Sequence, residues 1–261
     1  MDLTEYRSLQ IERERIANLM DLVRRGRSVL DVGARDGHVS RMLLDRFDSV
    51  TALDLGKPVV SHERITCVQG DVTNLEFPPD TFDVVLCAEV LEHISPDQLP
   101  RACQELMRVA KLCVVIGVPF KQDIRVGRTT CSNCGGKNPP WGHVNTFHQA
   151  KLEELFAGYE IEAVTFVGEN REHTNEVSAV LMNWAGNPYG TYSQEEPCVV
   201  CGRWLGMPRP MGMQEKVLAK LGVWIQRFCS LWQSIHPNWV HLRIVKKGGG
   251  ECADRLNTRI L

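Results

Sequence analysis

The stretch that decides the fold is Val29-Leu30-Asp31-Val32-Gly33-Ala34-Arg35-Asp36-Gly37-His38. An apolar strand ends in an acidic residue, passes through a glycine loop and is followed by a segment with helical spacing. Such a strand–loop–helix unit brings backbone N–H groups to a ligand at the mouth of the strand. A second apolar strand, 49–53, ends on Asp54, about 20 positions after the loop, where a carboxylate can accept hydrogen bonds from ribose hydroxyls. The stretch therefore predicts a nucleoside-containing cofactor.

The spacing of the glycines argues against a dinucleotide site and against a phosphate-binding P-loop. A dinucleotide fingerprint needs G-x-G-x-x-G, whereas here Arg35 stands between Gly33 and Gly37. A P-loop is excluded because no Lys-Ser or Lys-Thr pair follows the glycines. Two further signals follow along the chain, namely Gly70-Asp71-Val72 after a strand at 65–69 and Glu89-Val90-Leu91-Glu92-His93-Ile94 after a strand at 82–87.

These signals, in this order, resemble the class I S-adenosylmethionine-dependent methyltransferases, in particular their small-molecule branch. The resemblance covers residues 28–182, and Arg35 departs from the glycine that the family usually has there. It implies a doubly wound, mostly parallel seven-stranded α/β sheet, a Rossmann-like fold, with S-adenosylmethionine as cofactor. The cofactor-binding residues that it implies are Asp31, Gly33, Arg35, Gly37, Asp54, Asp71, Val72 and Glu89.

The resemblance also implies a role for these positions. Asp31 and Gly33 would border the methionine end of the cofactor, and Gly37 would let the next helix approach closely. Asp54 would hold the ribose hydroxyls. Asp71 would accept a hydrogen bond from the adenine amino group, Val72 would lie against the adenine ring, and Glu89 would face the reacting centre.

Methyl transfer requires an aligned acceptor and, for most acceptors, removal of a proton. His93 follows strand 82–87 closely and has a side chain suited to general-base catalysis, although it could instead pack within a loop. His143, in the segment 142–147, is the second candidate, with substrate contact or a structural hydrogen bond as alternatives. Glu92 is interpreted as a solvated loop carboxylate. The resemblance favours oxygen of a small polar acceptor, such as a sugar, a glycolipid precursor or a natural product, over a nitrogen or a quinone-type ring hydroxyl.

The ten cysteines include two C-x-x-C-G motifs, formed by Cys131 and Cys134 and by Cys198 and Cys201. Two such motifs present four thiolates, the ligand set of a closed structural Zn²⁺ site. Disulfides or redox-active dithiols are the alternative. Cys67, Cys87 and Cys113 lie in apolar strand patterns typical of reduced buried thiols, and the remaining three cysteines are isolated in the sequence. A cytosolic location also disfavours disulfides, so zinc is the prediction.

Alternating strand and helix patterns predict a parallel sheet covered on both faces. The expected strands are 28–32, 49–53, 65–69, 82–87 and 112–118, and the expected helices are 38–46, 97–109 and 149–157. Segments 159–168 and 174–184 are expected to form the closing hairpin. The predicted organisation is an N-terminal helix (1–27), the methyltransferase domain (28–184) with an insertion at 120–147, a second zinc-knuckle segment (185–211) and a C-terminal helical extension (212–261).

Residues 213–233 carry an apolar, aromatic stripe of helical period with interleaved basic residues. Such a helix can pack on its own domain, form a dimer interface or substrate lid, or lie on a membrane surface. The net charge of −2 argues against a nucleic-acid partner, and the sequence contains neither an apolar run of membrane-spanning length nor a secretory signal, so a cytoplasmic monomer or homodimer is expected. The alternative function is a zinc-stapled protein- or RNA-binding module on a degenerate methyltransferase scaffold.

Overall fold

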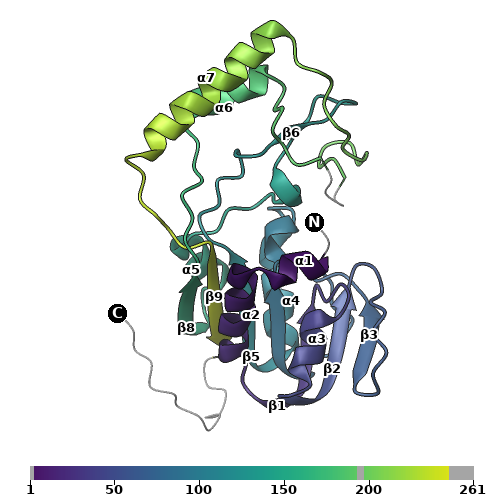
Figure 1. Ribbon diagram of the computed structural model, residues 1–261. Coiled ribbons are helices and arrows are strands. Elements are labelled where there is room, and N and C mark those ends of the chain that lie inside the picture. The colour runs from purple at the N-terminus through teal and green to yellow at the C-terminus, as the bar shows by residue number, and fades with distance from the viewer. Residues whose placement is uncertain (1–2, 193–196, 247–261) are drawn as a thin grey trace.

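The computed structural model describes residues 3–192 and 197–246 and is built on one seven-stranded sheet (Figure 1). In spatial order its strands are β3 (Ile65–Gln69), β2 (Phe47–Asp54), β1 (Gly26–Val32), β4 (Phe82–Ala88), β5 (Ala110–Pro119), β9 (Trp239–Val245) and β8 (Glu160–Val167). Strands β1 to β5 pair in parallel, and β9 runs antiparallel to both of its neighbours. The predicted doubly wound, mostly parallel sheet is confirmed. Because the strand order reverses between β1 and β4, a ligand crevice is expected at their carboxyl ends.

Helices cover both faces of the sheet, as the alternation of buried residues requires. In β4, Val84 and Leu86 pack against α2 (Gln10–Leu22) and α3 (His38–Leu43) on one face. Val85 and Cys87 pack on the other face, against α4 (Leu99–Val109) and α5 (Gln149–Leu155). Parallel strands buried on both faces are continuous apolar runs, which is why the sequence located them well.

The predicted closing hairpin is half wrong. Segment 159–168 is β8, but 174–184 forms a helix, α6 (Glu176–Trp184). This helix begins at Asn175, whose side chain accepts a hydrogen bond from the Ser178 N–H at 2.9 Å and so caps the helix. The strand that pairs with β8 is β9, which comes from the region predicted as a helical extension. The sheet therefore closes only with residues 239–245.

Two connections leave the sheet and form a second body above it in Figure 1, which we call the upper lobe (residues 123–142, 174–192 and 197–232). It contains β6 (Thr129–Thr130), β7 (Lys137–Asn138), the short helix η2 (Pro140–Gly142), α6 and α7 (Met213–Ser230). Helix α7 packs on α6 through Gly222, where a β-carbon would lie 3.3 Å from Ser178 O.

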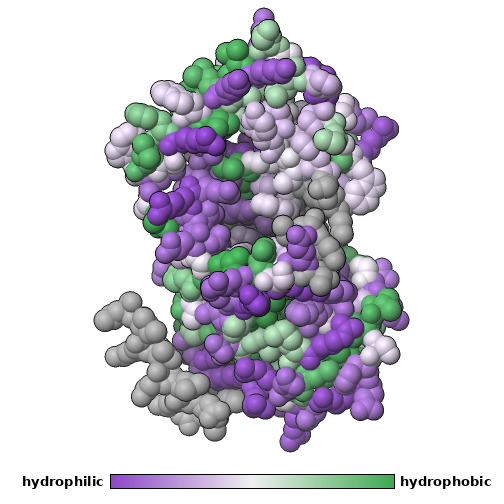
Figure 2. All heavy atoms as spheres, in the orientation of Figure 1, coloured by the Kyte–Doolittle hydropathy of each residue, from purple (hydrophilic) through white to green (hydrophobic). Residues whose placement is uncertain are grey.

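The packing of α7 on α6 accords with the interpretation of 213–233 as a helix packed within its own chain. This applies to the face of α7 that contacts α6. Figure 2 shows hydrophobic side chains alternating with hydrophilic ones on the outer surface over α7. Among the described residues, no helix is both long and apolar enough to span a bilayer. Residues 247–261, the end of the predicted extension, lie outside the described residues.

Candidate functional site

The glycine loop that follows β1 is held in a left-handed backbone conformation. Gly33, Arg35 and Gly37 have φ angles of 81°, 48° and 74°. A β-carbon at Gly33 would lie 2.3 Å from Val90 Cγ2, and one at Gly37 would lie 2.2 Å from Val60 Cγ2. Both outer positions therefore need glycine for conformation and for space. Arg35 adopts the left-handed conformation itself, so the loop keeps the path that a glycine would allow at this position.

Hydrogen bonds anchor this loop to the end of β2. Gly33 N–H donates to Leu53 O at 2.8 Å, and Arg35 N–H donates to Asp54 Oδ2 at 2.8 Å. Asp54 is half-buried at the last position of its strand. The structure thus brings the glycine loop and Asp54 together, and Oδ1 of Asp54 is the oxygen left to accept from a ligand hydroxyl.

Asp31 lies beneath the loop and is 4% exposed. The Ser40 hydroxyl donates to Asp31 Oδ2 at 2.5 Å and so joins the end of β1 to α3. Burial raises the pKa of Asp31 to about 7, although the Ser40 hydrogen bond opposes this shift and the Asp54 charge adds to it. This carboxyl is therefore positioned as an internal support of the loop.

The third acidic position predicted for the cofactor lies after β3. Asp71 is exposed, and its Oδ1 accepts from both the backbone N–H and the hydroxyl of Thr73 at 2.8 Å. Val72 is 4% exposed and belongs to the larger apolar core. The turn fixes the direction of the Asp71 carboxylate and leaves Oδ2 as the oxygen that can face a ligand.

Sequence analysis missed a buried polar network above β4. Arg15 of α2 donates to both Glu12 oxygens at 2.6 and 2.7 Å, and its NH1 lies 3.8 Å from Glu89 Oε1. Trp239 Nε1 of β9 donates to Glu89 Oε2 at 3.2 Å. Burial raises the pKa of Glu89, and the Arg15 charge opposes the shift. A buried Glu-x-x-Arg pair within an otherwise apolar helical stripe was the signal that could have revealed it.

Two polar atoms of this network, Arg15 NH1 and Glu89 Oε1, are buried and have no hydrogen-bond partner among the described residues. The two atoms form a loose ion pair but neither makes a hydrogen bond, so together they suit a ligand that carries both signs of charge. The α1 helix (Leu3–Ser8) covers this region, because Arg7 binds Asp36 of the glycine loop through two hydrogen bonds of 2.7 Å.

The two candidate histidines lie next to each other. His93 ends the short helix η1 (Leu91–His93) after β4, and His143 follows η2; their ring centroids are 4.8 Å apart. Desolvation lowers the pKa of His143 to about 3, with His93 adding to the shift. The pKa of His93 is also lowered, by desolvation and by the Arg35 charge, although one side of the residue is exposed. Both shifts favour the neutral imidazole, and the larger shift makes His143 the weaker proton acceptor of the two.

The expectation for Glu92 is wrong, because this side chain is fully buried rather than solvated. One ligand atom each from Glu92, His93 and His143 fall within 4.8 Å of one another. Both Glu92 carboxylate oxygens are buried and lack a hydrogen-bond partner among the described residues. Burial raises the pKa of Glu92 well above its usual range, and the nearby Glu89 charge adds to the effect.

Backbone hydrogen bonds hold the His143 segment against η1. Val144 N–H and Asn145 N–H both donate to Glu92 O, at 2.8 and 3.2 Å. The buried Asn145 amide donates to Leu91 O at 3.1 Å and to Ile94 O at 2.6 Å. This hydrogen bonding explains why residues from two connections, some 50 positions apart, share one site.

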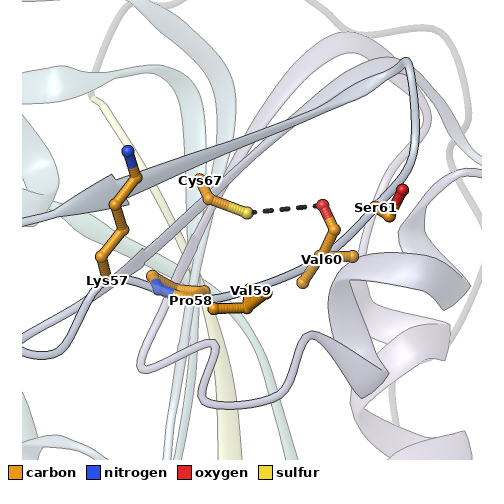
Figure 3. Close-up of a pocket in the computed structure, with 6 residues that line it drawn as sticks. All are labelled: Lys57, Pro58, Val59, Val60, Ser61 and Cys67. Carbon is orange, nitrogen blue, oxygen red and sulfur yellow. Dashed lines mark hydrogen bonds between the residues drawn. The ribbon is translucent and has the colours of Figure 1, made fainter.

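The connection from β2 to β3 flanks the glycine loop on its other side (Figure 3). Val60 packs against Gly37, and its carbonyl accepts from the Cys67 thiol at 3.8 Å. A hollow of about 370 Å³ lies between this connection and Cys67 and is lined by Lys57, Pro58, Val59, Val60, Ser61 and Cys67. Neither His93 nor His143 lines this hollow, so we assign the chemistry to the carboxyl edge of the sheet and not to the hollow.

The four cysteines of the two C-x-x-C-G motifs converge, as predicted. Cys131 Sγ lies 3.8 Å from Cys201 Sγ, and Cys134 Sγ lies 3.8 Å from Cys198 Sγ. All four sulfur atoms lie within 4.8 Å of one another. A tetrahedral Zn²⁺ site with Zn–S bonds of about 2.3 Å has edges of about 3.8 Å, whereas a disulfide needs about 2.05 Å. The donor set and its spacing therefore fit a zinc ion and not a pair of disulfides.

A buried asparagine joins the two cysteine turns. Asn138, 1% exposed, donates to Gly136 O at 3.1 Å and accepts from Val199 N–H at 2.8 Å. Its backbone lies in β7, five positions before His143, which follows η2. The cysteine cluster thus anchors the connection that carries one of the two candidate bases.

Comparison with known proteins agrees with this architecture. Residues 30–112 match the protein family described as Methyltransferase domain. A ubiquinone biosynthesis O-methyltransferase from Pseudomonas paraeruginosa is 34% identical over 94 residues, which cover 32% of this chain and 40% of that protein. The chain therefore matches only about two fifths of the length of this relative.

Solved structures share the fold at low sequence identity. The N-methyltransferase NodS from Bradyrhizobium japonicum has a TM-score of 0.52 at 13% identity, over 92% of this chain and 98% of that one. A Burkholderia thailandensis 1,6-didemethyltoxoflavin-N1-methyltransferase, solved with S-adenosylhomocysteine bound, has a TM-score of 0.50 at 21% identity, over 63% of this chain and 74% of that one. The sheet described above is thus a methyltransferase fold.

Proposed function

We propose that this protein transfers a methyl group from S-adenosylmethionine to oxygen of a small-molecule acceptor. The observation that carries the proposal is the junction of the glycine loop, Asp54 and Glu89 at the crevice between β1 and β4. The family match over residues 30–112 covers the whole of this junction and supports the assignment.

The residues present fit this cofactor. Asp54 Oδ1 would accept from the ribose, and the glycine loop would pass beneath the nucleoside. The amino-acid end of the cofactor is a zwitterion, so Arg15 NH1 would bind its carboxylate and Glu89 Oε1 its ammonium group, since neither atom makes a hydrogen bond within the described residues. The Trp239 hydrogen bond and the Glu12 pair would keep these two groups in place before the cofactor arrives.

The sulfonium of the bound cofactor supplies an activated methyl group, so the protein has to align the acceptor and accept a proton from it. His93 is the group best placed to accept that proton, because it is neutral and has access to solvent. His143 is more deeply buried and would orient the acceptor or His93.

Oxygen is favoured as the methylated atom because the Pseudomonas relative is named as an O-methyltransferase of ubiquinone biosynthesis. That name makes a ring hydroxyl the first acceptor class to test. A sugar or a glycolipid precursor, which the sequence patterns favoured, remains the second. Both classes present a hydroxyl, and phenolic and sugar substrates can be compared in one assay of methyl transfer.

We also propose one structural Zn²⁺ per chain, held by Cys131, Cys134, Cys198 and Cys201. Four thiolates leave no open coordination position, so the ion would stabilise the upper lobe and take no part in the reaction. Metal analysis of the purified protein tests this directly: one zinc per chain is expected, and its absence from a folded sample would refute the assignment.

If the acceptor is lipid-linked, the exposed face of α7 would contact the membrane surface that carries it. Trp224, Phe228 and Trp232 form a continuous exposed stripe, with ring centroids 5.8 and 4.9 Å apart. Basic residues flank this stripe, at Lys216, Lys220 and Arg227. Sedimentation with vesicles of anionic phospholipid tests peripheral membrane contact, which Trp224→Ala combined with Trp232→Ala should abolish. A second copy of the chain on the same face would instead appear as a dimer in solution.

Calorimetric titration with S-adenosylhomocysteine tests the proposed cofactor. We expect micromolar binding by the wild type and at least tenfold weaker binding by Asp54→Ala, because hydrogen bonds to a charged acceptor contribute about 1.5–3 kcal/mol each. Asp48→Ala, at the opposite end of the same strand, is the matched control and should bind as the wild type does. A folded wild type that does not bind would favour the alternative, a protein- or RNA-binding module.

A further inference from the structure

The Glu92 carboxylate is fully buried, yet among the described residues neither of its oxygens has a hydrogen-bond donor. Buried polar groups are almost always paired with protein, water or an ion, and an unpaired carboxylate is costly. Two imidazole rings, His93 and His143, lie within reach of the same carboxylate. Arg15 acts on Glu92 only through its charge, so no cation among the described residues is hydrogen-bonded to this carboxylate.

We propose that Glu92, His93 and His143 bind one divalent transition-metal cation. Two imidazole nitrogens and one carboxylate oxygen form a ligand set suited to Mn²⁺, Fe²⁺, Co²⁺ or Zn²⁺, with further positions left open. The three ligand atoms lie within 4.8 Å of one another. Ligands bound about 2.0–2.2 Å from one ion are separated by about 3–4 Å, so a slight closure of the side chains suffices.

The surroundings of His143 have the features of a supported metal ligand. Its Nδ1 is 2.6 Å from Gln122 Oε1, which accepts the ring N–H. That hydrogen bond leaves Nε2 as the nitrogen with a free lone pair, and such an outer contact to a carbonyl oxygen is typical of metal-bound histidines. The backbone bonds from Val144 and Asn145 to Glu92 O fix the carboxylate segment against the histidine segment.

The exposed side of His93 provides a route for the cation and an opening for a substrate. In the context of the proposed function, on which this step rests, the cation would hold the acceptor hydroxyl and stabilise its conjugate base. The acceptor class would then be a molecule with two neighbouring oxygen donors, since these can occupy adjacent coordination positions. Because His93 would then be bound to the cation, water and not His93 would take up the hydroxyl proton, and the oxygen–methyl bond would form as the carbon–sulfur bond breaks.

Titration of the full-length protein with Mn²⁺, followed by the electron paramagnetic resonance signal of free Mn²⁺, tests the site. Mn²⁺ prefers oxygen and nitrogen ligands, so the four thiolates of the cysteine cluster do not compete for it. We expect one bound Mn²⁺ per chain and at least tenfold weaker binding by Glu92→Gln and by His143→Ala. Gln122→Leu should weaken binding by tenfold or more while leaving all three ligands in place.

The control variant is His62→Ala, which removes an exposed histidine of the β2–β3 connection and should bind Mn²⁺ as the wild type does. Titration with S-adenosylhomocysteine on the same samples separates the two proposals. A protein that binds S-adenosylhomocysteine but no Mn²⁺ would overturn the metal site and leave the proposed function standing, with a buried water beside Glu92. A protein that binds Mn²⁺ but no S-adenosylhomocysteine would overturn the proposed function and leave the metal site standing. Equal Mn²⁺ affinity in the wild type and Glu92→Gln would also refute the site.

Discussion

The sheet body and the upper lobe are stabilised by different means. The interior of the sheet body consists of apolar side chains that are almost entirely buried, on both faces of β1, β4 and β5. Among the described residues of the upper lobe, the buried apolar cluster consists of Cys131, Cys198 and Leu205, while Trp204 and Trp232 are 70% and 71% exposed. A body with so little apolar core needs another source of stability, and four converging thiolates are such a source. The comparison favours a sheet held together by apolar burial and a lobe held together by the proposed Zn²⁺.

Removal of the proposed Zn²⁺ should produce the largest difference between the upper lobe and the sheet body. A chelator strong enough to strip zinc should unfold the upper lobe and leave the sheet folded, because binding free energy is folding free energy for such a site. Amide hydrogen exchange is the measurement: protection should disappear in 124–142 and 197–206 and persist in β1, β4 and β5. Cys131→Ser should reproduce the pattern, whereas Cys229→Ser, on α7, should not. Unchanged exchange after chelation would show that the sulfurs do not hold the lobe.

Truncation of a leucine side chain should destabilise the sheet body much more than the upper lobe. Leu86→Ala, at a fully buried position of β4, should lower the free energy of unfolding of the sheet by about 3–5 kcal/mol. Leu221→Ala removes the same side chain from α7, where it is 43% exposed, and should cost about 1 kcal/mol or less. Chemical denaturation followed by circular dichroism compares the two. Similar losses for both variants would mean that the lobe has an apolar core after all.

Asp31 allows a test by pH within the sheet body. Its pKa is raised from 3.8 to about 7 in the folded protein, so the stability it contributes is fully present below pH 3.8 and is lost as the pH rises through about 7. Asp31→Asn removes this dependence. Relative to the wild type, the variant should therefore gain about 3 kcal/mol of stability between pH 5 and pH 8. A difference in melting temperature that does not change with pH would show that Asp31 titrates normally.

Strain in the glycine loop gives the smallest expected effect. Arg35→Gly should stabilise the sheet body by up to about 1 kcal/mol, because the left-handed conformation is unfavourable for a residue with a β-carbon. Arg35→Ala retains that cost and serves as the control. The two melting temperatures should differ, with the glycine variant higher. If alanine is equally stable, the loop relaxes without strain.

The strands of the sheet body could be predicted because their signal is local. The strand expected at 65–69 is β3 to the residue, and that expected at 112–118 is β5, Ala110–Pro119. By contrast, β9 alternates apolar and polar residues in the way a half-buried strand does, but its position after a long helical segment concealed it. The β-branched residues Val177 and Val180 favoured a strand where the Asn175 cap starts a helix.

The candidate site also contains a part that could be predicted from the sequence and a part that could not. The glycine loop and Asp54 lie near one another in sequence and could be predicted together. The Arg15–Glu89 contact and the grouping of Glu92 with His143 depend on helices and loops folding back over the sheet, and no spacing rule specifies such contacts. The burial of Glu92 is the clearest example, since its sequence context is the polar end of a loop.

The place of β9 has a consequence for synthesis of the chain. Its register pairs Trp239 with both Val167 and Pro119, so residues 168–238 must be made before the sheet can be completed. A nascent chain on the ribosome would present the edge of β5 unpaired until residue 245 has emerged. An open, apolar strand edge is a site of intermolecular pairing. Chaperone capture during translation should therefore begin once β5 has been made and end when β9 docks.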